Sequence, residues 1–161
     1  MNAPPDFERR PDRAEVLVFP PLVPVAGIAA GFVLNWLHPM PFLSAQTASW
    51  LGPVAIACAV LLALSAAYSL HRADTTIDVR GKTTRITAAG PFRYSRNPIY
   101  LSMILFQLGI GALVNSLWIW SLAIPAILVL RHCVISREES YLEAKFGSEY
   151  RRYREKVRRW V

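Results

Sequence analysis

The sequence predicts an all-α integral membrane protein with about four transmembrane helices, a C-terminal helical hairpin and short cytosolic amphipathic helices. Of its 161 residues, 53% are hydrophobic, and the length suits one domain. Residues 16–70 contain no Asp, Glu, Lys or Arg, and neither do residues 97–130. Because a helix needs about 20 apolar residues to cross the hydrocarbon core, the first run has room for two spans and the second for two short ones.

The 18 Lys and Arg residues follow this predicted topology. Three precede the first apolar run, six lie between the runs and nine follow the second, while the connections at 38–47 and 115–116 contain none. Excess Lys and Arg marks cytoplasmic loops, so we expect a multi-pass protein with both termini in the cytosol, in the inner membrane if the source is bacterial. The net charge of +7 then suits contact with anionic membrane lipids and argues against a nucleic-acid partner.

The first half of the chain predicts a tail followed by a transmembrane helix pair over residues 16–70. Residues 1–15 mix acidic residues, arginines and prolines, which indicates a retained cytosolic tail. The first span covers residues 16–37, with a kink or a late helix start where three prolines cluster. The second covers residues 48–70, where small residues at every fourth position predict close packing against another span: Ala55, Ala59, Ala63 and Ala67. Two cysteines without a C-x-x-C motif support neither a disulfide framework nor a metal site.

Residues 71–97 read as a cytosolic loop that ends in turn signals. Gly90-Pro91 predicts a turn. Asn97-Pro98 has the form of an N-cap followed by proline at the first helical position. A helix N-terminus also carries free N–H groups and a partial positive charge that suit a carboxylate, so capping and ligand binding stay open as roles for Asn97.

Residues 98–134 are expected to form a transmembrane hairpin, with spans at 98–114 and 117–134 joined tightly at Asn115-Ser116. Residues 135–161 form a cytosolic amphipathic segment. Gly147 followed by Ser148 predicts a helix end and the N-cap of a second short helix, both helices lying along the membrane surface. One helical face would carry Leu142, Phe146, Tyr150, Tyr153, Val157 and Trp160.

Two polar clusters from distant parts of the sequence are predicted to meet at one membrane depth. Glu138 and Glu139 lie about one turn past the fourth span, on the same side as Arg93, Arg96 and Asn97. A cleft there would offer arginines and helix N–H groups to a carboxylate, and glutamates to an ammonium group or ribose hydroxyls. Aromatic side chains for a planar base are Phe92, Tyr94 and Tyr100. These are the requirements of S-adenosylmethionine.

Four motifs occur in order, with the predicted hairpin between the second and the third. They are Gly90-Pro91-Phe92-Arg93, Arg96-Asn97-Pro98-Ile99-Tyr100, Glu138-Glu139-Ser140-Tyr141-Leu142 and Phe146-Gly147-Ser148-Glu149-Tyr150-Arg151-Arg152-Tyr153. As an ordered set they resemble the signature of the isoprenylcysteine carboxyl methyltransferase and phospholipid methyltransferase superfamily of integral-membrane enzymes. The resemblance covers residues 83–161.

This resemblance implies a methyltransferase with S-adenosyl-L-methionine as cofactor and a lipophilic methyl acceptor that enters from the bilayer. The residues that it assigns to cofactor binding are Thr87, Gly90, Phe92, Arg93, Arg96, Asn97, Pro98, Ile99, Tyr100, Glu138 and Glu139. No metal is implied. Methyl transfer from a sulfonium depends on position and exclusion of water, so the lack of a Ser/His/Asp constellation is compatible with an enzyme.

Two departures from the family pattern concern the acceptor. Asn97 stands where the isoprenylcysteine enzymes have His, and Val134 corresponds to their Arg one turn before the glutamate pair. Arg131 is the nearest basic residue and becomes the candidate catalytic residue on the acceptor side. The function implied is isoprenylcysteine carboxyl methyltransferase-like, with phospholipid amine or small-thiol methylation as alternatives.

A hypothesis from another class is a non-catalytic four-span scaffold or transporter subunit. The predicted spans lack the intramembrane charges that mark an ion or substrate path. Cofactor binding separates this hypothesis from the enzyme.

Overall fold

The computed structural model describes residues 16–73 and 86–161, and this part of the chain is helical apart from loops and one isolated β-bridge. The predicted tail and residues 74–85 of the predicted loop lie outside the described residues. The α-helices are α1 (Leu22–Leu37), α2 (Ala45–Arg72), α3 (Pro98–Leu113), α4 (Leu117–Ser121), α5 (Ala123–Val129), α6 (Ser136–Phe146) and α7 (Ser148–Lys156). A 3₁₀ turn, η1 (Gly90–Arg93), precedes α3, and a π-helical turn, η2 (Leu130–Ile135), joins α5 to α6.

Within the described ranges, two helices are long and apolar enough to cross a membrane. One is α2, with 28 residues, and the other is the 30-residue rod Leu117–Phe146 formed by α4, α5, η2 and α6. The helices α1 and α3 are apolar but have 16 residues each. The all-α prediction is therefore confirmed for these residues.

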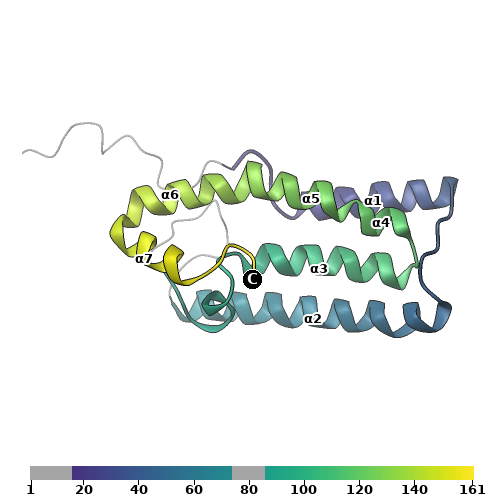
Figure 1. Ribbon diagram of the computed structural model, residues 1–161, viewed down its shortest axis with the longest axis horizontal. Coiled ribbons are helices and arrows are strands. Elements are labelled where there is room, and N and C mark those ends of the chain that lie inside the picture. Colours follow the sequence, from purple (N-terminus) through teal and green to yellow (C-terminus); the bar gives the residue numbers. More distant parts are fainter. Residues whose placement is uncertain (1–15, 74–85) are drawn as a thin grey trace, which may run out of the picture.

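Helix α3 lies between α2 on one side and the layer of α1 and α4 to α6 on the other (Figure 1). Glycines allow α2 and α3 to approach closely: a Cβ atom at Gly52 would lie 2.5 Å from the Leu113 Cα. A Cβ at Gly109 would lie 3.3 Å from that of Ala55, and Ala59 is buried. Small residues thus bring the two backbones into contact, as the alanine stripe predicts.

Helix α1 begins at Leu22, six residues later than the predicted start of the span, so the late start is confirmed. Pro20 and Pro21 precede the helix, and Pro24 lies in its first turn, where the missing N–H has no intrahelical acceptor to lose. The segment before α1 packs on the π-helical turn, where the Leu17 N–H donates to the Cys133 carbonyl at 3.2 Å.

The helix of the predicted fourth span does not end near residue 134 but continues through η2 into α6. Leu130, Val134 and Ile135 are all fully buried. In a π-helical turn the residues at i+4 and i+5 both lie on the face of residue i, which explains why all three reach the core. A 30-residue helix is about 45 Å long, so its last turns extend beyond a hydrocarbon core of about 30 Å.

The predicted break at Gly147 is correct, although Gly147, with φ of +52°, is itself the N-cap of α7 and Ser148 is the first helical residue. Helix α7 ends at Lys156 and the chain continues in extended conformation, so Val157 and Trp160 are not on one helical face as predicted. Tyr150 is 2% exposed and belongs to the interior rather than to a surface face.

At the other end of the bundle, the α1–α2 connection is fixed to the α3–α4 turn (Figure 1). The Asn115 side chain accepts from the N–H groups of Phe42 and Leu43 at 3.0 and 2.9 Å and donates to the Leu43 carbonyl at 2.8 Å. Trp118 Nε1 donates to the His38 carbonyl at 2.8 Å. These bonds join two connections that are far apart in the sequence.

Candidate active site

The polar end of the bundle is where η1, the start of α3, α6, α7 and the last residues of the chain meet (Figure 1). Tyr100 in the first turn of α3 donates its hydroxyl to Glu138 Oε2 at 2.9 Å. Glu138 lies in the first turn of α6, and Tyr100 is 5% exposed within the main hydrophobic core. This bond connects the two motifs that the sequence predicted to meet.

Glu139 is buried and faces two guanidinium groups. Its Oε1 lies 3.4 Å from Arg96 Nη2, and it accepts from Arg159 Nε at 3.1 Å. Its Oε2 accepts from Arg159 Nη2 at 2.5 Å. Two cations share one carboxylate, so the three side chains together carry an excess positive charge, which favours binding of an additional anion.

The Arg96 side chain is only 10% exposed and is incompletely paired. Its Nε and Nη1 atoms are buried, and neither has a hydrogen-bond partner among residues 16–73 and 86–161. Leaving a buried charged donor unsatisfied costs more than about 1–3 kcal/mol, so such atoms call for a specific explanation. A bound anion supplies one.

Asn97 occupies the N-cap position of α3, but its side chain makes no capping hydrogen bond. Its Nδ2 instead donates to the main-chain carbonyl of Arg159 at 3.0 Å, and its backbone N–H donates to Ser95 Oγ at 3.1 Å. The predicted position is thus correct, while side-chain capping is wrong because the amide is used by a distant segment.

The 3₁₀ turn is held between α2 and α7. Gly90 has φ of +55°, and a Cβ there would lie 2.3 Å from Ser69 Oγ on α2. The carbonyl of buried Phe92 accepts from the Tyr153 hydroxyl at 2.8 Å. These contacts therefore fix the position of η1 and of the start of α3 that follows it.

The remaining predicted residues lie near this cluster in sequence without joining its charged contacts. Thr87 Oγ1 accepts from the Ala89 N–H at 3.3 Å, and the Ile99 carbonyl accepts from the Ser102 hydroxyl at 2.6 Å. Pro98 is buried and Arg93 is exposed. Arg131 is exposed on η2, while Val134, the position of the family arginine, is fully buried.

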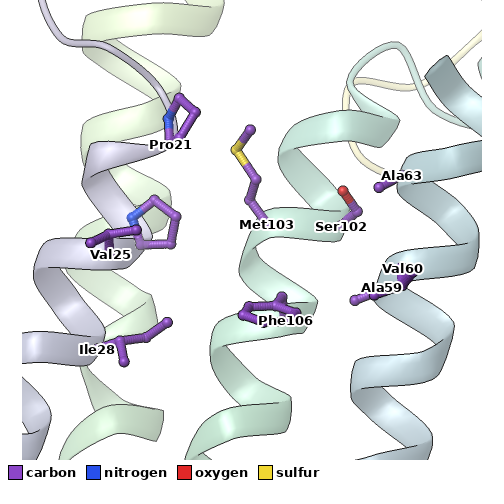
Figure 2. A pocket seen from close by; sticks show the side chains of 10 residues that line it. Pro21, Val25, Ile28, Ala59, Val60, Ala63, Ser102, Met103 and Phe106 are labelled. Carbon is purple, nitrogen blue, oxygen red and sulfur yellow. The ribbon is translucent and has the colours of Figure 1, made fainter.

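An apolar groove of about 240 Å³ lies between α1, α2 and α3 (Figure 2). Ser102 and Met103, which line it, follow Tyr100 by two and three residues in α3. The other lining residues are apolar: Pro21, Pro24, Val25, Ile28, Ala59, Val60, Ala63 and Phe106.

A family model described as phospholipid methyltransferase matches residues 47–149, which is more than half of the chain. The chain belongs to the phospholipid methyltransferase family. An uncharacterized protein of Haemophilus influenzae is 48% identical over 63 residues, which are 39% of this chain and the whole of that protein. The family places this phospholipid methyltransferase homologue among the membrane methyltransferases, and the non-catalytic alternative is not favoured.

The motifs at residues 96–100 and 138–142 both fall inside the stretch matched to the phospholipid methyltransferase family. Residues 150–161 fall outside it. The amphipathic pattern of this last stretch predicted a surface segment and did not reveal the contacts of Arg159, Tyr150 and Tyr153. Burial, followed by the negative charge of Glu139, raises the pKa of Tyr150 to about 12, so its phenol stays neutral. The Tyr-x-x-Tyr spacing was the available signal, but it indicates one buried face without saying what that face contacts.

Proposed function

We propose that this protein transfers a methyl group from S-adenosyl-L-methionine to a lipophilic acceptor at the polar end of the bundle. The observation that carries this proposal is the buried Arg96 guanidinium, whose Nε and Nη1 have no protein partner in the described part of the chain. The carboxylate of the donor molecule matches these two N–H groups in charge and in hydrogen-bonding character.

The surrounding residues suit the rest of the donor. Glu138, which accepts from Tyr100, offers an acceptor for the donor's ammonium group or its ribose hydroxyls. Burial raises the pKa of the Glu138 carboxyl to about 7, so its negative charge is complete only above that pH. When bound, S-adenosylmethionine supplies a methyl carbon already activated by the sulfonium charge, and the protein contributes orientation and exclusion of water. We assign the other predicted donor-binding residues to the same site. They are Thr87, Gly90, Phe92, Arg93, Asn97, Pro98 and Ile99.

The apolar groove between α1, α2 and α3 supports a lipophilic acceptor, because its lining suits a hydrocarbon chain and it begins within one turn of Tyr100 (Figure 2). For the acceptor head group, the candidates are an isoprenylcysteine-type carboxylate and a phospholipid amine. Two glutamates lie at this end, Val134 replaces the family arginine, and Arg131 is exposed. The lack of a buried basic residue at position 134 to pair with an acceptor carboxylate favours the amine.

We further propose that all four apolar helical segments cross the membrane, with the polar end and both termini on the cytosolic side. The distribution of Lys and Arg supports this orientation, because the connections at the opposite end contain none. The methyl donor, which is water-soluble, would then reach the site from the cytosol, and the acceptor from the lipid phase.

The proposal predicts that purified protein in detergent transfers labelled methyl groups from S-adenosylmethionine into a lipid extract. We expect label in the lipid fraction, with phosphatidylethanolamine vesicles labelled more than an added prenylcysteine. Label in the prenylcysteine alone would reverse the head-group assignment. No label in any lipid, together with no measurable binding of S-adenosylhomocysteine, would refute the proposed reaction.

Replacing Glu138 by glutamine is expected to weaken S-adenosylhomocysteine binding about ten- to a hundredfold. The substitution keeps the size and the acceptor for the Tyr100 hydroxyl but removes a charge-assisted contact worth about 1.5–3 kcal/mol. Calorimetric titration measures the affinity. Glu143→Gln is the matched control, because Glu143 lies on the same helix and pairs with Arg151 and Arg154 near the surface. Equal affinities for both variants and the wild type would make Glu138 an ordinary structural acid.

A further inference from the structure

Residues 157–161, here called the C-terminal strap, leave α7 and return to the start of α3. The backbone N–H of Arg96 donates to the Arg158 carbonyl at 2.9 Å, and Ser95 and Arg158 form an isolated parallel β-bridge. The hydroxyl of Ser95 and the amide of Asn97 both donate to the Arg159 carbonyl, at 3.4 and 3.0 Å. The strap is therefore bonded directly to the Arg-Asn-Pro motif.

Apolar contacts hold the strap in this place. Val157 is 7% exposed, and Trp160 packs against the main hydrophobic core. Main-chain and apolar contacts on both sides of Arg159 fix its backbone, so placing its side chain beside Glu139 costs no further backbone conformational entropy.

The Arg159 side chain changes the charge balance around Arg96. Arg159 donates to both oxygens of Glu139, whereas Arg96 lies 3.4 Å from one of them. Without Arg159, Glu139 and Arg96 would form a neutral pair. With it, the three side chains carry one net positive charge, and Arg96 keeps Nε and Nη1 unpaired within the described part of the protein.

We infer that Arg159 is a positioning residue of the methyl-donor site: by engaging Glu139, it keeps the buried Arg96 guanidinium available for the donor's carboxylate. This inference rests on the proposed function. It adds to the site a residue outside the stretch matched to the family and gives the C-terminal strap a role in donor affinity as well as in stability.

The test compares Arg159→Gln with Arg158→Gln, which removes the same charge from an exposed neighbour on the strap. Calorimetry with S-adenosylhomocysteine measures affinity, and the melting temperature of the ligand-free protein in detergent measures stability. We expect Arg159→Gln to weaken binding about tenfold and Arg158→Gln to change it less than about twofold. The KM for the acceptor should stay unchanged in both, since the groove is not altered.

Arg159→Lys keeps the charge and loses the two-point contact, so its affinity should fall between those of the wild type and Arg159→Gln. This variant also carries the test if Arg159→Gln does not fold, in which case a tenfold loss in Arg159→Lys overturns the inference. Wild-type affinity in Arg159→Gln, or an equal loss in Arg158→Gln, overturns it while leaving the proposed function intact. A wild-type protein that does not bind S-adenosylhomocysteine overturns both.

Discussion

Replacing Arg96 by alanine is expected to weaken binding of S-adenosylhomocysteine by about a hundredfold or more. Two buried guanidinium nitrogens have no partner in the described protein, and hydrogen bonds to charged groups are worth about 1.5–3 kcal/mol each. A combined loss of about 3 kcal/mol corresponds to roughly 150-fold in affinity. Titration calorimetry on the detergent-purified protein measures it directly.

The fold should tolerate this substitution, because Glu139 keeps its two hydrogen bonds from Arg159 and is not left as an unpaired buried charge. Arg152→Ala is the matched control: Arg152 is an exposed arginine on α7 and is not among the residues assigned to the donor site. It should change affinity less than about twofold, as expected for a screened surface charge. If both alanine variants bind as tightly as the wild type, Arg96 does not hold the donor and the proposed site is wrong.

The apolar organisation of the bundle followed from the sequence because it depends on local composition. Runs without charge predicted the helical segments, and alanines at every fourth position predicted close packing of α2 against another span, which is α3. The three prolines predicted the late start of α1, since each removes a donor that only the first turn can spare. These features need no knowledge of distant contacts.

The continuation of the fourth helix into α6 could not be read from the same patterns. Polar residues after Ile135 indicated the end of a membrane span, but a helix that leaves the membrane need not stop there. The π-helical turn arises from packing, because it brings both Val134 and Ile135 to the buried face of Leu130. No spacing of apolar residues in the sequence marks such a turn uniquely.

The candidate site was predictable where residues lie in compact motifs and unpredictable where the chain returns from afar. Tyr100 and Glu138 were expected at one end and are hydrogen-bonded. The pairing of Glu139 with Arg159 depends on the path of residues 157–161, where the helical spacing of Val157 and Trp160 predicted a helix that in fact ends at Lys156. Asn97 illustrates the same limit, since its cap position followed from the sequence and its bond to the Arg159 carbonyl did not.

The other large effect is expected at the opposite end of the bundle, where Asn115 connects two loops. Asn115→Ala removes three hydrogen bonds to Phe42 and Leu43 and places at φ of +52° a residue that tolerates the left-handed region less well than Asn. At about 1 kcal/mol for each bond and about 1 kcal/mol for the left-handed backbone, the loss of stability is about 3–4 kcal/mol.

A graded series of variants separates the contribution of the hydrogen bonds from that of the left-handed backbone. Melting and denaturation experiments in detergent measure the stability of each variant. Asn115→Asp keeps the oxygen that accepts from Phe42 and Leu43 and should be the mildest, although its charge meets no Lys or Arg in either connection. Asn115→Gly relieves the backbone but loses all three bonds, so its stability should fall between those of the aspartate and alanine variants. Ser121→Ala, at an exposed position on α4, serves as the neutral reference. If Asn115→Ala has the same melting temperature as Ser121→Ala, the hydrogen bonds of Asn115 do not stabilise the bundle. The contacts of α2 with α3 must then hold the two connections together.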